Sequence, residues 1–135
     1  MFWLSHHHPD EDNRTYVLGG VRVCARCLGT YPVMLTTLVG LFVLRAPREW
    51  RWDVPGVLGL TLPALVDWAV GRFRPASGSN AWRTLTGVLL GLALGRSLQV
   101  HVQWPLPPVL LAQAALVTVV AVPVILATYR RPRPG

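Results

Sequence analysis

The sequence contains no lysine and few charged residues of any kind. All thirteen basic residues are arginines, and charged residues make up 14% of the 135-residue chain. A soluble domain carries about a quarter of its residues as charged side chains, so this composition argues against an ordinary soluble fold. Apolar residues reach 52% and the mean hydropathy is +0.40. The composition therefore predicts a membrane protein.

The sequence also lacks the features of a signal peptide and of a nucleic-acid-binding surface. Residues 1–5 are followed by histidines and acids, with no basic region and no continuous apolar stretch. We therefore expect the first membrane helix to direct insertion. The net charge of +7 comes from arginines that flank apolar runs and do not form one basic stripe. This distribution is typical of membrane topology, so we expect a lipid bilayer and no nucleic acid as partner.

Several apolar segments are long enough to cross a bilayer. A spanning helix needs about 20 residues, and backbone in lipid must be hydrogen-bonded within a helix or a closed barrel. The runs lack strict alternation, which favours helices. The sequence thus predicts an all-α membrane protein of a single domain with four transmembrane helices. The predicted parts are an N-terminal segment 1–27, helices at about 28–44, 54–70, 84–100 and 106–128, and a basic tail 129–135.

The positions of the arginines predict the orientation in the membrane. With four spans, the N-terminal segment, the second connection and the tail share one side and carry nine arginines, against four on the other side. Positive residues favour the cytoplasmic side. We therefore expect a multi-pass protein of the cell membrane with both termini cytoplasmic. Thiols on that side stay reduced, which disfavours a structural disulfide.

The chain has only two cysteines, and they form a Cys-x-x-Cys motif directly before the first apolar segment. Cys24 and Cys27 follow a run of three histidines, His6, His7 and His8. Cysteine thiolates and histidine nitrogens are the ligands that zinc takes in tetrahedral sites. We therefore expect a zinc-type metal site built from these residues. Two alternatives stay open: a dithiol that exchanges electrons, and two small buried residues at a helix start.

Polar residues near the ends of the predicted spans are candidates for the same site. Asp67 interrupts the second segment, and an ionisable residue at membrane depth is a functional candidate by default. Its alternative role is an ion pair with Arg83 or Arg72 that anchors the turn. Ser79 or Asn80 is a candidate N-cap of the third helix. The predicted topology brings the following polar candidates to the same end as the cysteines: Arg26, Asp67, Asn80 and Arg83.

Glycines recur at a spacing of four in the third segment. Gly87, Gly91 and Gly95 line one face and let another helix approach closely. That helix belongs either to the same chain or to a second copy, so a homo-oligomer through these glycines stays open. Arg96 lies near the other end of this segment, and we expect its side chain to extend toward the interface.

Short motifs along the chain are shared with a known family. The first is His-His-x-Pro, then Arg-Thr, then Cys-Ala-Arg-Cys-x-Gly-x-Tyr, within residues 6–31. The second is Asp67, followed by Asn-x-x-Arg-x-x-Thr-Gly beginning at Asn80. Over about residues 5–95, the chain resembles the DUF2085 family of small predicted integral membrane proteins. Many members begin with Cys-His, whereas Ser5 stands here, which removes one thiol ligand. The resemblance implies a membrane fold and supports these site residues, and it implies no established activity.

The sequence therefore predicts an integral membrane protein with a zinc-type His/Cys site at its cytoplasmic face. No enzymatic reaction is assigned. Two other functions remain as alternatives. One is a membrane thiol oxidoreductase that uses Cys24 and Cys27, and the other is an oligomeric transporter or channel with Asp67 and Arg83 along the path.

Overall fold

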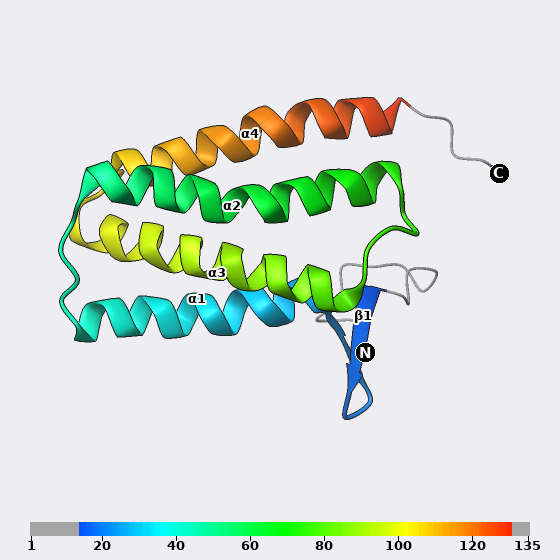
Figure 1. The fold of residues 1–135 in the computed structure, drawn as a ribbon, viewed down its shortest axis with the longest axis horizontal. Helices are drawn as coiled ribbons and strands as arrows, with labels where there is room; N and C mark the ends of the chain where they lie inside the picture. The colour runs from blue at the N-terminus through cyan, green and yellow to red at the C-terminus, as the bar shows by residue number, and fades with distance from the viewer. Residues whose placement is uncertain (1–13, 131–135) are drawn as a thin grey trace.

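The computed structural model describes residues 14–130, which form a short β-hairpin followed by four helices. Each of these helices is long and apolar enough to cross a membrane. They lie side by side along one axis (Figure 1). The all-α membrane fold predicted from the sequence is thereby confirmed. The elements are β1 (Thr15–Leu18), β2 (Val21–Cys24), α1 (Ala25–Val43), α2 (Trp50–Phe73), α3 (Asn80–Gln103) and α4 (Pro108–Tyr129).

The helices begin or end outside the apolar segments that the sequence marks. α1 begins at Ala25 and α3 at Asn80, so Arg26 and Arg83 lie within helices and not in connections. Backbone hydrogen bonding continues past the point where hydropathy falls, which is why hydropathy places these boundaries poorly. Ser79 is the N-cap of α3, and its hydroxyl accepts a hydrogen bond from the Trp82 backbone N–H at 3.2 Å. One of the two expected caps is thus confirmed.

The hairpin before α1 is an element that hydropathy alone does not predict. Gly19 and Gly20 form its two-residue loop with φ angles of +57° and +83°. Such loops favour glycine because both central residues take positive φ. The antiparallel register pairs Thr15 with Cys24. The chain that enters β1 therefore lies directly beside the cysteine motif.

The glycine face of α3 packs against α1 of the same chain. A Cβ added at Gly91 would lie 2.6 Å from the Thr30 carbonyl oxygen, and one at Gly95 would lie 2.7 Å from the Thr37 Cβ. The Thr30 hydroxyl donates to the Gly87 carbonyl oxygen at 3.1 Å. Contact with a second copy through this face would have to displace α1. A homo-oligomer as such stays a prediction.

A chain of buried hydrogen bonds joins α2, α3 and α4. The Ser97 hydroxyl donates to the Gln113 side-chain oxygen at 2.7 Å, and the Gln113 amide nitrogen donates to the Thr61 hydroxyl at 2.9 Å. All three side chains are buried. Because they come from α3, α4 and α2, the chain fixes the outer helix α4 to the bundle. Hydrogen bonds of this kind between membrane helices contribute on average about 0.6 kcal/mol each.

Arg96 forms a buried ion pair at the end of the bundle where α1 meets α2. Its Nε and Nη2 atoms donate to the two carboxylate oxygens of Asp53 at 2.8 and 2.9 Å, and its Nη1 donates to Gln99 at 2.7 Å. Its Nη2 atom also donates to the Pro47 carbonyl oxygen in the α1–α2 connection at 2.6 Å, so the side chain extends toward the end of the bundle as expected, and the pair with Asp53 is a contact that the sequence does not predict. The antiparallel packing of α2 on α3 places Asp53, in the first turn of α2, opposite Arg96.

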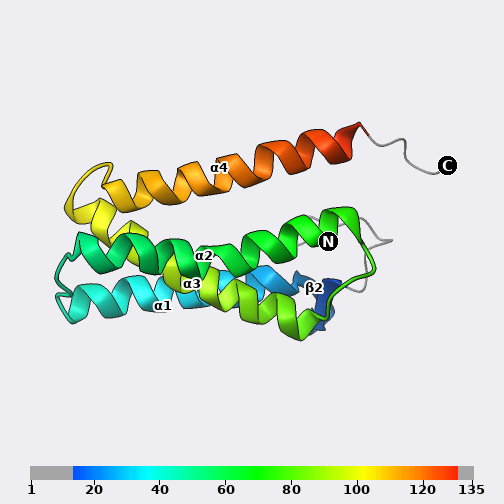
Figure 2. The ribbon, with the colours of Figure 1, turned by 45° about the horizontal axis from the view of Figure 1, so that its top comes forward.

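The polar residues of interest gather at the opposite end of the bundle. The hairpin, the end of α2, the start of α3 and the end of α4 all lie there (Figure 1). A second view shows the same arrangement, with α4 on the outside against α2 (Figure 2). We call this the hairpin end of the bundle.

Candidate functional site

The two cysteines lie next to each other at the junction of β2 and α1. Cys24 is the last residue of β2, and Cys27 lies in the first turn of α1. Both thiols are free, Cys24 is 7% exposed and Cys27 is half-buried. The motif therefore presents two neighbouring sulfurs at the hairpin end.

Asp67 forms an ion pair with Arg26, which lies between the two cysteines in the sequence. The Arg26 Nη2 atom donates to the Asp67 Oδ2 atom, and the two side chains are only 22% and 8% exposed. The sequence predicts Arg83 or Arg72 as the partner of Asp67, and this prediction is wrong. The Arg72 guanidinium lies over the Trp68 ring instead, 5.6 Å from its centroid. Because α1 and α2 both pack on α3, Arg26 comes within reach of Asp67, and nothing local in the sequence indicates this pair.

Arg83 also lies near Asp67, and Gly78 lies close to both side chains. The residue exposure of Arg83 is 6%, and its Nη2 atom donates to the Ser77 carbonyl oxygen at 2.6 Å. A Cβ at Gly78 would lie 3.7 Å from both Arg83 Nη2 and Asp67 Oδ1, and Gly78 has a φ of +85°. Glycine is therefore favoured here by conformation. The charges that act on Arg83 include those of Arg14, Asp67 and Arg26.

Two further contacts hold the hairpin and the α2–α3 connection against the helices. The Arg14 guanidinium donates to the carbonyl oxygens of Gly71 and Pro75, both at 3.0 Å. The Asn80 amide donates to the Thr15 carbonyl oxygen at 3.3 Å. The sequence analysis of individual residues misses the role of Arg14, although the Arg-Thr motif includes it. We refer to Arg14, Arg26, Asp67, Asn80 and Arg83 as the charged cluster.

Three buried atoms of the charged cluster have no hydrogen-bond partner. They are Arg26 Nε, Asn80 Oδ1 and Arg83 Nη1, and the described part of the chain has no other such side-chain atom. Leaving a buried polar group unpaired costs about 1–3 kcal/mol. Such atoms are rare in folded proteins and call for an ion, a ligand or a water. All three belong to residues that the sequence marks as site candidates.

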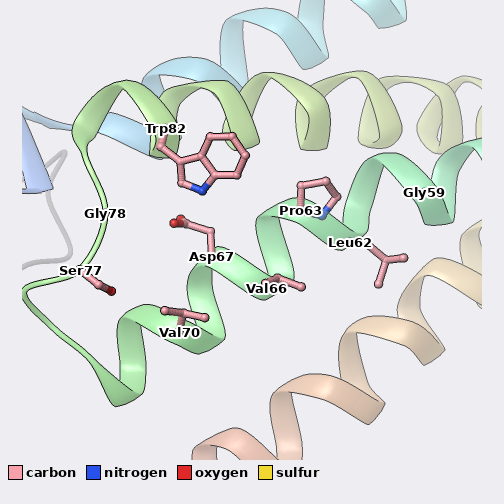
Figure 3. Close-up of a pocket in the computed structure, with 9 residues that line it drawn as sticks. All are labelled: Gly59, Leu62, Pro63, Val66, Asp67, Val70, Ser77, Gly78 and Trp82. Carbon is pink, nitrogen blue, oxygen red and sulfur yellow. The ribbon is translucent and has the colours of Figure 1, made fainter.

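A groove lies beside the charged cluster, between α2 and the start of α3. It encloses about 540 Å³ and its lining is mostly apolar. Asp67 lies at its polar end with Trp82 nearby (Figure 3). The lining residues are Gly59, Leu62, Pro63, Val66, Asp67, Val70, Ser77, Gly78 and Trp82.

The predicted metal ligands fall only partly within the described residues. Between residues 14 and 130, no group of three or more His, Cys, Asp or Glu side chains is placed to hold a metal ion. His6, His7 and His8 lie outside this range. Cys24 and Cys27 lie within the described range, and the metal site as a whole stays a prediction.

Comparison with known proteins identifies one family. The model of the family described as predicted membrane protein (DUF2085) matches residues 7–96. This range covers the hairpin, the cysteine motif and every residue of the charged cluster, and it ends within α3. No curated protein and no solved structure matches the chain.

Proposed function

The chain belongs to the DUF2085 family of predicted membrane proteins, and we propose that this multi-pass membrane protein holds a zinc-type metal ion at the hairpin end of its bundle. Cys24 and Cys27 supply two thiolate ligands. One or two of His6, His7 and His8 complete the tetrahedral set that zinc prefers.

The hairpin register is the observation that supports this proposal most directly. Thr15 pairs with Cys24, so the chain on its N-terminal side starts beside the cysteines. His8 precedes Thr15 by seven positions. Seven residues span at most about 25 Å, which leaves ample length for the chain to return to the sulfurs.

Arginine side chains lie near the cysteine motif. Arg26 lies between the two cysteines in the sequence. The thiolate is the form that binds a metal, and a bound cation itself promotes loss of the thiol proton. Asp67 balances part of this positive charge through its ion pair with Arg26.

We also propose that the hairpin end faces the cytoplasm. The nine arginines on the hairpin side outnumber the four on the other side, as expected for a cytoplasmic face. Thiols there stay reduced, which favours metal binding over a lasting disulfide.

Metal analysis of the purified full-length protein tests the metal proposal. We expect about one zinc ion per chain in the wild type, and its loss in Cys24→Ala/Cys27→Ala and in a variant with all three N-terminal histidines replaced by alanine. His101→Ala is the matched control, because this histidine lies at the other end of α3 and should leave the zinc content unchanged.

Two results would contradict the metal site. One is a wild-type protein without bound metal, and the other is full zinc content in the double-cysteine variant. A thiol oxidoreductase is the second candidate, because the free thiols of Cys24 and Cys27 lie near each other at the junction of β2 and α1. It predicts a metal-free protein in which Cys24 and Cys27 form a reversible disulfide, detected by thiol labelling under oxidising and reducing conditions.

A further inference from the structure

The β-hairpin carries apolar side chains that the described part of the chain leaves uncovered. Val17 and Leu18, at the end of β1, are 66% and 51% exposed. Directly opposite residues of an antiparallel pair share a face, so the register places Leu18 and Val21 on one face. Tyr16 and Val23 share that face, because side chains alternate along a strand. A two-stranded hairpin alone in water is at best marginally stable, so this apolar hairpin is a candidate contact surface.

The hairpin starts beside the ends of two helices that are long enough to span a membrane. Arg14, just before β1, donates to the Gly71 carbonyl oxygen in the last turn of α2 at 3.0 Å. The Thr15 carbonyl oxygen accepts from the amide of Asn80, the first residue of α3, at 3.3 Å. Trp82 follows in the first turn of α3 and is 50% exposed. Because tryptophan is enriched where membrane meets water, these contacts place the hairpin at the level of the bilayer interface.

The hairpin runs across the long axis of the bundle and not along it (Figure 1). It extends past α1, on the side away from α2 and α4. Membrane helices lie on average within about 20° of the bilayer normal, so an element across the bundle axis runs nearly parallel to the bilayer. The four residues of β1 reach about 10 Å sideways. The tip therefore lies beside the lipid that covers the outer face of α1, where Tyr31, Leu35 and Val39 are exposed at a spacing of four.

We propose that this hairpin is an interfacial membrane anchor whose tip, Val17 and Leu18, inserts among the phospholipids of the leaflet at the hairpin end. Apolar surface at this depth is stabilised in proportion to the area buried at the boundary between headgroups and acyl chains. The contact continues the lipid-facing surface of α1 and needs no particular headgroup. Because β2 ends at Cys24, the anchor also fixes the cysteine motif at the membrane surface. The proposal does not depend on the metal site, because it uses neither thiol.

Photocrosslinking of the full-length protein in phosphatidylcholine vesicles tests the contact with lipid. The photoreactive residue p-benzoylphenylalanine replaces Leu18, and mass spectrometry identifies the molecule to which it becomes bonded. We expect lipid adducts as the main product. The same residue in place of Ala76 is the matched control for the affinity of the probe itself for lipid. Ala76 is exposed in the α2–α3 connection, which extends farther along the bundle axis than the hairpin (Figure 1). It should give at least about tenfold less lipid adduct, because it lies beyond the interface.

A charge at the tip tests whether apolar burial holds the hairpin in the interface. With the photoreactive residue in place of Val17, Leu18→Asp should lower the yield of lipid adducts at least about tenfold, because a carboxylate favours water over the interface. Leu18→Met is the matched control and should keep the yield, since methionine is apolar and of similar volume. Both positions are exposed, so neither change disturbs the packing of the bundle.

Three results would overturn the proposal. The first is an equal yield of lipid adducts from the probes at positions 18 and 76. The second is an unchanged yield in Leu18→Asp. The third is crosslinking of position 18 chiefly to protein, either to residues 1–13 of the same chain or to a second copy, because this would show that protein and not lipid covers the hairpin.

Discussion

The two residues between the cysteines, Ala25 and Arg26, each contact another helix. Ala25 is fully buried, and its carbonyl oxygen accepts a hydrogen bond from the Thr84 hydroxyl at 3.0 Å. Arg26 carries the ion pair to Asp67 on α2. The Cys-Ala-Arg-Cys motif therefore joins α1 to both neighbouring helices at the hairpin end, in addition to presenting two thiols.

Replacing Asp67 by asparagine should destabilise the protein. The change leaves Arg26 with a largely buried guanidinium and no counter-charge. Breaking a buried pair from one side costs about 3 kcal/mol. Unfolding of the purified protein in mixed micelles of increasing denaturing detergent would measure the loss.

Glu49→Gln is the control for this change, because it removes a carboxylate from an exposed position at the other end of the bundle. It should leave stability within about 0.5 kcal/mol of the wild type. A double-mutant cycle with Arg26→Gln should show a coupling energy between about 0.5 and 3 kcal/mol. A coupling near zero would mean that Asp67 and Arg26 do not stabilise each other.

At the scale of the elements, the contact between α1 and α3 is the closest in the molecule. Gly29 on α1 and three glycines on α3 let the two backbones approach: a Cβ at Gly29 would lie 3.0 Å from the Val88 backbone nitrogen. The hydroxyl groups of Thr30 and Thr84 then bond carbonyl oxygens across the interface. This interface holds the cysteine motif against the start of α3.

Gly91→Ala should separate α1 from α3 and destabilise the bundle by about 1–3 kcal/mol. The added methyl group would lie 2.6 Å from the Thr30 carbonyl oxygen, which is backbone and cannot move aside cheaply. Gly40→Ala on α1 is the matched control, because a Cβ there meets nothing within 4 Å. It should be neutral or slightly stabilising, since alanine is the better helix former. Thermal unfolding in detergent compares the two, and equal stability would show that the close approach is not required.

At the scale of the whole molecule, the two ends of the bundle differ in their charge. The hairpin end holds the charged cluster with its unpaired donors, whereas the other end holds a saturated pair in which Arg96 bonds Asp53, Gln99 and the Pro47 carbonyl oxygen. At the Arg96 end the guanidinium is hydrogen-bonded within the chain, whereas at the hairpin end unpaired donors remain that a ligand could bond. The arginine excess at the hairpin end also predicts its side of the membrane.

Reporter fusions in a bacterial host test this orientation. A green fluorescent protein joined to Gly135 should fluoresce and an alkaline phosphatase joined there should be inactive, because the C-terminal end of the chain is predicted to face the cytoplasm. A phosphatase joined after Arg48, in the α1–α2 connection, should be active. The opposite pattern would place the hairpin end outside, where the cysteines meet an oxidising environment.

Local patterns along the sequence were enough to predict four membrane helices and Ser79 as one of two candidate caps, and they marked Arg26, Asp67, Asn80 and Arg83 as site candidates. Hydropathy, cap chemistry and glycine spacing each depend on neighbours within a few turns, and such signals can be read without knowing the fold. The Gly19–Gly20 pair between the short runs Thr15–Leu18 and Val21–Cys24 is also a local hairpin signal, which hydropathy does not detect.

Only the tertiary structure decided which residues meet. It paired Asp67 with Arg26 and Arg96 with Asp53, and it placed the glycine face of α3 on α1 of the same chain. It also showed that the unpaired donors lie beside an apolar groove. Pairings between helices depend on the rotation and crossing of whole elements, which the packing of many side chains determines together. A chain with thirteen arginines and six acids offers many plausible ion pairs, and packing alone selects among them.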